Sequence, residues 1–552
     1  ESLLNEYQSQ INQILKVSFD HLSPASVKKC FAYCSIFPQD TELGEDELIQ
    51  HWVAKASIRT LFLHLEGGVS TDMLLRFKCL HVLKLSGYDV KFLPSSIGKL
   101  LHLRLLNISS SGITSLPESL CKLYNLQTLT MRDDALQGGF PKRMSDLISL
   151  RHLNYYHNRA KFKMPAQMGR LTCLQTLEFF NVSQKRGCGI EELGTLKYLK
   201  GSLEVRNLGL VKGKEAAKQA KLFEKPDLSS LKFMWDSEGC DEDVLEGLQP
   251  HPNLQQLEID FFMGNKFPQW LINLPKLVEL QVCCCKIGEL PALGQLPSLK
   301  CLLLTGLDNI RSIGDEFYRS STRRRKFFPA LEELRVEYME NLVEWKDADQ
   351  KCPLPCLERL SIWSCNGLTT ISDKMFESCR LSLRSLKVGY CRNLVSFSLN
   401  LQEMSSLEEF TLVGCPKLIP HRFNGFAFAT SLRKLWIGPF SSDDSSIDGF
   451  DWSGLRSAST LRDLRLQGLP HTESLPHQLQ YLTTLTSLTL ADFEGIEALP
   501  DWIGNLVSLE TLKLWSCEKL RSLPSEAAMR RLTKLTHVDV YRCPLLRQRY
   551  TP

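Results

Sequence analysis

The sequence contains no apolar run that approaches the roughly 20 residues that a membrane-spanning helix needs. Its amino terminus also lacks the basic segment followed by an apolar segment that marks a secretory signal. We therefore expect an intracellular chain without a membrane span, in the cytoplasm or alternatively in the nucleus. The chain begins at Glu1 rather than Met, which favours the downstream part of a longer product.

The chain has little excess charge of either sign. Its 66 Lys and Arg against 62 Asp and Glu give a formal net charge of +4. A charge this weak and this dispersed predicts no nucleic-acid partner. The composition, 43% hydrophobic and 23% charged, excludes a disordered chain and is typical of a globular protein with enough apolar side chains for a core.

No glycine-rich phosphate-binding loop occurs in the sequence. Such a loop, G-x-x-x-x-G-K-[ST], needs an upstream glycine and a hydroxyl residue, and both are missing around Gly98-Lys99-Leu100 and Gly213-Lys214-Glu215. The scattered His, Asp and Ser residues form no nucleophile elbow, metal pair or recurring acid/base dyad. We therefore predict no catalytic, cofactor-binding or metal-binding residue in this chain, and no enzyme.

What the sequence does contain is an internal repeat. Five segments are apolar at their first, fourth and sixth positions and have Cys at the ninth: LERLSIWSC, LRSLKVGYC, LEEFTLVGC, LETLKLWSC and LTHVDVYRC, starting at Leu357, Leu383, Leu407, Leu509 and Leu535. This is the leucine-rich repeat pattern L-x-x-L-x-L-x-x-N/C. Related copies start at Ile58, Leu80, Leu103, Leu126, Leu150, Leu174, Leu228, Leu254, Leu277, Leu299, Leu331, Leu432, Leu461 and Leu485, with a poorer copy near Lys200. Roughly twenty repeats therefore cover nearly everything after residue 57.

The repeat pattern predicts an α/β fold, a leucine-rich-repeat horseshoe solenoid over residues 57–552. In each copy the fourth and sixth residues point inward from a short strand, while the third, fifth and seventh point outward, because side chains alternate along a strand. One repeat cannot bury its own apolar side, so neighbouring repeats stack and their strands form a parallel sheet on the concave face. Return segments such as ITSLPESLCKL, residues 113–123, fill the core beneath the outer side.

The Cys residues at the ninth position have a structural interpretation. A small, weakly polar side chain suits the tight turn after the strand, where Asn would otherwise bond loop backbone. These residues are Cys285, Cys365, Cys391, Cys415, Cys517 and Cys543. The run Cys283 to Cys285 leaves a metal site open as the less favoured alternative, with Cys283 facing solvent and Cys284 at the strand end.

The outward strand residues of the concave sheet are the predicted partner-binding surface. Large aromatic side chains mixed with Arg and Lys on one exposed sheet are typical of binding hot spots. The alternative is that each Trp packs on its neighbours and shields the sheet. Toward the carboxyl end the outward residues are Arg359, Ser361, Trp363, Lys387, Lys434, Trp436, Arg465, Lys513, Trp515, His537, Asp539 and Tyr541.

Residues 1–56 break the repeat. Apolar residues in this segment follow helical spacing. In SPASVKKCFAYCSIF, Ser23 is the expected helix cap and Pro24 takes the first helical position, and in GEDELIQHWVAKA acidic residues occupy the first turn. We expect three short helices in a small all-α unit. The segment ILKVSFDHLSPASVKKCFAYCSIFPQDTELGEDELIQHWVAKA, residues 14–56, resembles the winged-helix end of the nucleotide-binding switch module in plant disease-resistance proteins of the coiled-coil NLR class. The residues that carry this resemblance are Cys30, Phe31, Tyr33, Cys34, Phe37 and Pro38.

The repeats resemble the same family over almost their whole length, for example in LPSSIGKLLHLRLLNISSSGITSLPESLCKLYNLQTL and LQPHPNLQQLEIDFFMGNKFPQWL. This resemblance implies an intracellular immune receptor. In that family the repeats help to recognise a pathogen effector or a guarded host protein, and they contact the nucleotide-binding module, which holds ADP or ATP. Activation leads to defence signalling.

The sequence departs from the family at the join between Ala56 and Ser57. The family's Met-His-Asp motif would fall there, and it is absent together with the phosphate-binding loop. We therefore expect this chain neither to bind nor to hydrolyse ATP, and interpret the join as a deletion, a splice product or a fragment boundary. The alternatives are a solenoid adaptor, a switchless decoy that binds proteins without nucleotide-dependent signalling, and a cell-surface ectodomain.

Overall fold

We describe the fold from a computed structural model of the chain. The structure describes residues 58–64, 71–132, 140–156, 164–235, 242–318, 327–346, 354–371, 373–396, 403–418, 431–438, 458–468 and 474–550. The predicted winged-helix remnant, residues 1–56 with its six motif residues, lies outside these ranges. The chain divides into two compact units, residues 1–211 with 215–228 and residues 212–214 with 229–552, and each is described by itself.

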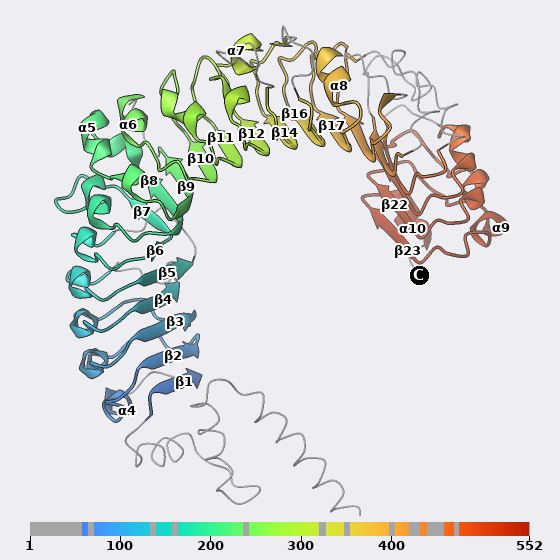
Figure 1. The fold of residues 1–552 in the computed structure, drawn as a ribbon. Coiled ribbons are helices and arrows are strands. Elements are labelled where there is room, and N and C mark those ends of the chain that lie inside the picture. The colour runs from blue at the N-terminus through green and yellow to red at the C-terminus, as the bar shows by residue number, and fades with distance from the viewer. Residues whose placement is uncertain are drawn as a thin grey trace, which may run out of the picture. The chain divides into compact units, whose positions relative to one another are not determined.

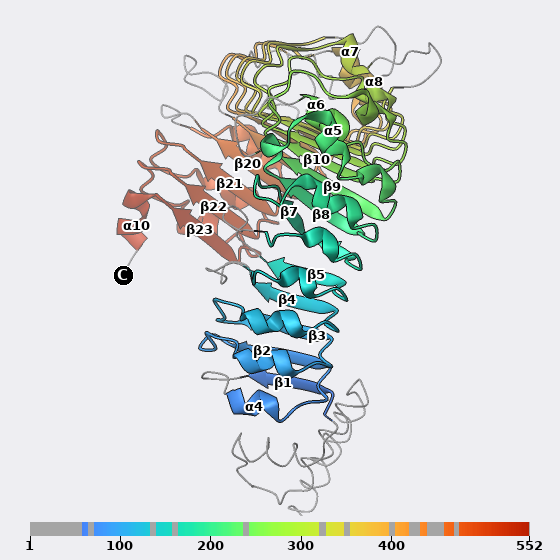
Figure 2. The same cartoon turned by 90° about the vertical axis from the view of Figure 1, so that its left-hand side faces the viewer.

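Unit 1 is a stack of short parallel strands (Figure 2). Six strands pair in chain order in one sheet: β1 (Thr60–His64), β2 (Val82–Gly87), β3 (Leu105–Ser111), β4 (Thr128–Arg132), β5 (His152–Tyr156) and β6 (Thr176–Leu177). Two further strands, β7 (Phe179–Asn181) and β8 (Gly201–Arg206), pair in parallel with each other. Neighbouring repeats are in register: the fourth residue of one repeat pairs with the fourth residue of the next, as Leu83 pairs with Leu106.

Unit 2 continues the same design in a curved parallel sheet (Figure 1). In sheet order its strands are β9 (Leu228–Met234), β10 (Gln256–Asp260), β11 (Glu279–Cys283), β12 (Cys301–Thr305), β14 (Glu333–Glu337), β16 (Arg359–Trp363), β17 (Ser385–Gly389), β18 (Glu409–Val413), β19 (Lys434–Ile437), β20 (Asp463–Gln467), β21 (Ser487–Ala491), β22 (Thr511–Trp515) and β23 (His537–Tyr541). A separate two-stranded parallel sheet joins β13 (Ser312–Ile313) and β15 (Glu344–Trp345).

Short helices form the outer side of the repeats, opposite the strands (Figure 1). The 3-10 helices are η1 (Ser95–Lys99), η2 (Glu118–Lys122), η3 (Met144–Asp146), η4 (Met168–Arg170), η5 (Ile190–Thr195), η6 (Leu208–Leu210), η7 (Leu222–Glu224), η8 (Gln269–Asn273), η9 (Leu293–Gln295), η15 (His477–Tyr481) and η16 (Asp501–Asn505). The α-helices are α4 (Thr71–Leu75), α5 (Gly213–Lys218), α6 (Glu242–Gly247), α7 (Asp315–Tyr318), α8 (Asp373–Cys379), α9 (Glu526–Met529) and α10 (Pro544–Tyr550). Pro94 and Pro117 each stand directly before a 3-10 helix, where the lack of an N–H is tolerated.

The core follows the predicted alternation. On β16, Leu360 and Ile362 are buried and contribute to the core, while Arg359 is exposed and Ser361 and Trp363 are half-buried. Because each repeat buries its apolar side only against its neighbours, the core extends along the sheet within each unit. This confirms the solenoid fold that the sequence predicts.

The ninth-position thiols lie in the turn after each strand. All six are buried. The Cys365 Sγ donates to the Val336 carbonyl of the preceding repeat at 3.5 Å, and the Cys543 Sγ does the same to Leu514 at 3.4 Å. The residue before the Cys has a positive φ, as at Ser364 (54°), which turns the chain out of the strand. The thiols thus supply the loop-backbone bond that Asn makes in the general pattern.

Candidate partner-binding groove on the concave sheet

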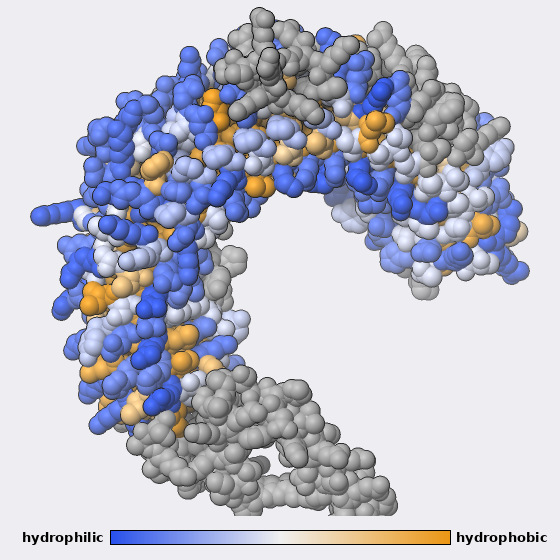
Figure 3. All heavy atoms as spheres, viewed as in Figure 1, coloured by the Kyte–Doolittle hydropathy of each residue, from blue (hydrophilic) through white to orange (hydrophobic). Residues whose placement is uncertain are grey.

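The outward residues of β14, β16, β17, β18, β19 and β20 enclose a groove of about 600 Å³ in unit 2. Seven of the predicted partner-binding residues line it: Arg359, Ser361, Trp363, Lys387, Lys434, Trp436 and Arg465. The groove is open on one side, since none of the described segments forms a second layer over this face of the sheet. In Figure 3, hydrophilic side chains line the inner edge of the arc that unit 2 forms.

The other five predicted residues lie outside this groove. Lys513 and Trp515 belong to β22, and His537, Asp539 and Tyr541 belong to β23. The Trp515 Nε1–H donates to the Asp539 carboxylate at 3.1 Å, and the Lys513 Nζ lies 5.7 Å from the centre of the Trp515 ring. These contacts hold Trp515 against its own sheet. The structure thus divides the predicted surface into a groove and a separate carboxyl-terminal patch.

Two indoles form the apolar part of the groove. The ring centres of Trp363 and Trp436 lie 6.3 Å apart with their planes at 52°, although their strands are separated by β17 and β18. Thr411, on the outward side of β18 and in register with Trp436, is only 7% exposed. The Trp363 ring also contacts Tyr390 edge to face at 5.1 Å. Both tryptophans remain half-exposed, so the pair lies over neighbouring strands and still presents a surface.

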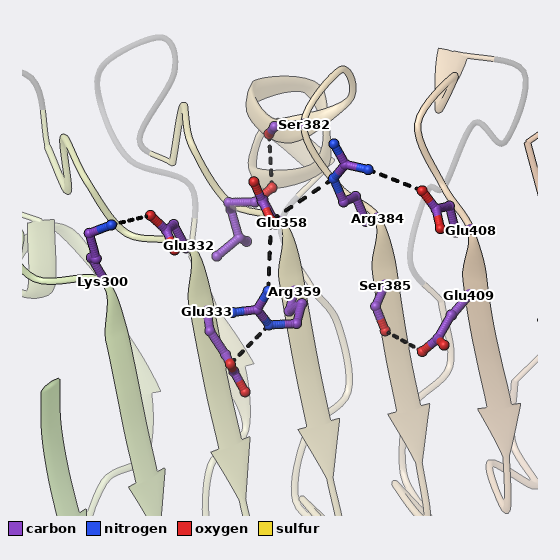
Figure 4. Close-up of polar contacts among 11 residues, drawn as sticks. Lys300, Glu332, Glu333, Glu358, Arg359, Ser382, Arg384, Ser385, Glu408 and Glu409 are labelled. Carbon is purple, nitrogen blue, oxygen red and sulfur yellow. Dashed lines mark hydrogen bonds and ion pairs between the residues drawn. The ribbon is translucent and has the colours of Figure 1, made fainter.

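A ladder of ion pairs runs along the edge of the sheet where the strands begin (Figure 4). Arg359 bonds Glu333 of the preceding strand at 2.9 Å and lies 3.7 Å from Glu358. One strand further, Arg384 bonds Glu408 at 3.0 Å. Pairs this exposed contribute little to stability singly. They do fix the orientation of the side chains at the rim of the groove.

Four carboxylates line the groove, and each has a cationic partner. Their pairs are Glu333 with Arg359 at 2.9 Å, Glu337 with Arg335 at 3.0 Å, Glu409 with Lys434 at 2.5 Å, and Asp463 with Arg465 at 3.8 Å. The hydrogen bond from the Lys434 ammonium lowers the pKa of Glu409 below its ordinary value. A fifth cation, Lys387, also lines the groove.

The repeat rule identifies several lining residues that our prediction omits. Glu333, Arg335 and Glu337 are the third, fifth and seventh residues of the copy that starts at Leu331. Glu409 and Asp463 are third residues in the same sense. Their position in the repeat pattern is enough to identify them as outward-facing, but the prediction selected mainly aromatic and basic residues. Because the acidic residues were omitted, the prediction did not show that four of the five cations of the groove are paired with carboxylates of the same groove.

The run of three cysteines begins at Cys283, the last residue of β11, and this residue lies beside an acidic pair. Ligand atoms of Glu258, Asp260 and Cys283 lie within 4.8 Å of one another. The Lys232 ammonium reaches both carboxylates, with Asp260 at 2.6 Å. Burial and these carboxylates raise the pKa of the Cys283 thiol well above its usual range. The side chain takes the outward position that the pattern predicts and is half-buried there, whereas Cys284 at the strand end is exposed. The cation of this cluster is therefore the protein's own ammonium.

Comparison with known families agrees with this architecture. A family model described as a leucine-rich repeat region matches residues 57–417, and a model of R13L1/DRL21 leucine-rich repeats matches residues 471–543. The chain therefore belongs to the leucine-rich repeat family. No helix among the described residues has the length and apolar character needed to cross a membrane.

The particular relatives are plant proteins. The chain is 31% identical to disease resistance protein RGA4 of Solanum bulbocastanum, over 66% of this chain and 44% of that protein. It is 28% identical to disease resistance protein RGA2 of the same organism, over 75% of this chain and 51% of that protein. The predicted resemblance to plant disease-resistance proteins is thus confirmed, and the chain spans about half the length of these relatives. Among solved structures, the plant peptide hormone receptor RGFR1 in complex with RGF2 matches with a TM-score of 0.44 and 18% identity, over 88% of this chain and 81% of that chain.

Proposed function

We propose that this chain is the repeat part of an intracellular plant immune receptor, and that the groove recognises a pathogen effector or a guarded host protein and thereby regulates defence signalling. The relatives named for disease resistance support the class of protein. The observation that carries the site is the half-exposed pair of Trp363 and Trp436 in an open groove bordered by charged residues. Clustered aromatic side chains with a polar rim are typical of the residues that dominate interface binding energy.

The test compares single tryptophan substitutions. Trp363 and Trp515 occupy the same seventh position of their repeats, one inside the groove and one outside it. Trp363→Ala, Trp436→Ala and the control Trp515→Ala would each be expressed in pathogen-challenged leaves and used to capture partners, and each captured protein would then be purified and titrated against the purified chain. We expect the two groove variants to weaken binding at least tenfold, and Trp515→Ala to leave it unchanged. Equal binding by all variants would place recognition elsewhere on the repeats.

We further propose that this chain is a binding module and not a nucleotide-binding enzyme. Both Gly-Lys pairs fit poorly to a phosphate. A Cβ added at Gly98 would lie 2.4 Å from the Ser119 carbonyl oxygen, so this glycine packs tightly against the next repeat. The Lys214 ammonium is already bonded to Glu246 at 2.7 Å. In a full-length receptor, a separate nucleotide-binding module would hold the ADP or ATP, and this chain would contact that module. Saturable binding of labelled ADP or ATP by the isolated chain at micromolar concentration would contradict this proposal.

A further inference from the structure

Within the described ranges, the charged residues of the groove leave one cation without a partner. Five cations line it against four carboxylates, and each carboxylate is paired with one of the other four cations. Lys387 makes no hydrogen bond or ion pair within the described residues. Lys387 acts electrostatically on Glu409, but the hydrogen bond to that carboxylate comes from Lys434. The groove therefore carries a net charge of about +1, located at Lys387.

Lys387 stands at the centre of the groove floor. It is the outward fifth residue of β17, exposed, and in register with Ser361 on one side and Thr411 on the other. Thr411 in turn faces Trp436. Two residues further along the same face of β17, Gly389 lies under the Trp363 ring. The register thus places Lys387 between the strands that carry the two indoles, and its side chain is exposed on the face that they share.

The two indoles also have unused donors. Neither the Trp363 nor the Trp436 N–H donates a hydrogen bond within the part of the chain that the structure describes. Other tryptophans of the chain do donate: Trp270 to the Leu245 carbonyl at 3.1 Å, and Trp515 to Asp539. An indole N–H offers a donor only, and an ammonium offers donors only. The Lys387 ammonium and the two indole N–H groups are therefore donors without a partner among the described residues, and a negatively charged acceptor would satisfy them. The Asp463 Oδ1 is an acceptor of the same groove that makes no hydrogen bond there, and the Arg465 guanidinium lies 3.8 Å from it.

We infer that the groove binds a protein segment through one carboxylate placed at Lys387, with an apolar side chain of the same segment packed on Trp363 and Trp436. This inference rests on the proposed function and names the chemistry of its partner. A single carboxylate matches the net charge of about +1, whereas a doubly charged group would meet repulsion from the four carboxylates that share the groove. A basic segment would leave Lys387 opposed by a like charge.

Charge-assisted hydrogen bonds in a partly enclosed site contribute more than neutral ones. Loss of such a bond corresponds to a decrease in affinity of about tenfold or more. Lys387→Met keeps most of the apolar stem and removes the charge, while Lys387→Glu reverses it. Both should fold, because the side chain is exposed and takes part in no ion pair with the described part of the chain. The matched control is Lys84→Glu on β2, which changes an exposed lysine at the same fifth position of its repeat in unit 1.

A displayed library of random 16-residue peptides would be selected in parallel on the intact chain, Lys387→Glu, Lys84→Glu and Trp436→Ala at about 0.15 M salt. We expect peptides from the intact chain and from Lys84→Glu to be enriched in Asp or Glu beside an aromatic or aliphatic residue. Lys387→Glu should lose this enrichment or replace the acid by Lys or Arg. Synthetic peptides of the consensus should bind Lys387→Met at least tenfold more weakly than the intact chain.

The outcomes separate the two proposals. Binders that depend on Trp436 but show no preference for Asp or Glu would overturn the carboxylate inference and keep the groove as the recognition surface. The same acidic enrichment on Lys387→Glu would also overturn it. Binders that ignore Trp436 altogether would contradict the proposed groove and the inference together. Comparison of free-acid with amidated peptides would show whether a side-chain or a terminal carboxylate occupies the site.

Discussion

Gly389 lies directly beneath the indole of Trp363. A Cβ added at residue 389 would lie 2.5 Å from the nearest atom of the Trp363 ring, closer than non-bonded carbon atoms approach one another. The φ of Gly389 does not require glycine. What the position requires is space, because the ring from β16 extends over β17.

The first prediction concerns this contact. Gly389→Ala should destabilise the protein by about 1 kcal/mol or more, because the ring must move or strain. In a Trp363→Ala background the same change should be neutral or stabilising by about 0.5 kcal/mol, since alanine is better than glycine within a strand. Urea unfolding of the four proteins gives the coupling energy. Additive effects would mean that the ring does not occupy this position in solution.

The second prediction concerns the thiols. Burial raises the pKa values of Cys285 and Cys379 to about 12, so both are protonated near neutral pH and closed to reagents. Cys79 and Cys356 are exposed. At pH 8, iodoacetamide should alkylate the exposed pair in the folded protein and spare the buried pair, and in denaturant it should alkylate all four. Mass spectrometry of the peptides reads out each site, and rapid labelling of Cys285 in the folded protein would contradict the described turn.

The third prediction concerns Lys225, which is 1% exposed and donates to the Leu196 carbonyl at 3.0 Å. Burial lowers its pKa to about 8. Between pH 8 and about 10.4 the folded state therefore binds fewer protons than the unfolded chain, and this lysine makes stability rise with pH. Lys225→Met should stabilise the protein by about 1 to 3 kcal/mol at pH 7 and flatten that rise.

The matched control for Lys225 is Lys197→Met, because Lys197 is exposed in the same region. Urea titrations at pH 7 and pH 10 would measure both variants. The advantage of Lys225→Met over the intact chain should shrink at the higher pH, where the native lysine is neutral in the folded state. An advantage that is equal at the two pH values would show that packing, not charge, is responsible.

The fourth prediction concerns the ammonium of Lys232 between Glu258 and Asp260. Lys232→Met leaves two carboxylates close together and poorly solvated, so we expect a loss of about 3 kcal/mol at pH 7. In the variant, burial and mutual repulsion raise the folded-state carboxyl pKa values above their unfolded values. The folded state then binds more protons, and stability should recover as the pH falls from 7 toward 5.

Lys300→Met serves as the control for Lys232, because its pair with Glu332 is exposed to solvent. It should change stability little and without this pH dependence. Urea unfolding at pH 7 and pH 5 distinguishes the two variants. A Lys232→Met protein that loses further stability on acidification would refute the assignment of charge in this cluster.

Much of the fold could be predicted from the sequence, because one pattern fixes both the strands and their phase. Leu360 and Ile362 are buried and Arg359 is exposed, as their places in the repeat require. The turn geometry at Cys365 also follows from the pattern. Strand bounds were predictable for the same physical reason, since every copy buries the same positions against its neighbours.

The groove was predictable only in part. The pattern identifies which side chains face outward, but not which of them neutralise one another, since that depends on long side chains reaching across strands. Arg359 is paired with Glu333, while Lys387, equally basic in the sequence, has no such pair among the residues that the structure describes. The reach of Trp363 to Trp436 across two strands was likewise invisible, because it depends on the missing side chain at Gly389.

That missing side chain has a consequence for how such a surface diversifies. The ring of one repeat lies on the glycine of the next, so the two positions cannot vary independently. A larger residue at 389 displaces or strains the ring at 363, and a smaller residue at 363 alone leaves the glycine uncovered, so each change made alone carries a cost. Substitutions at these two positions of adjacent repeats are therefore coupled. Exchange of the two neighbouring repeats as a unit changes both residues at once, and so can alter the binding specificity without the strain of either single substitution.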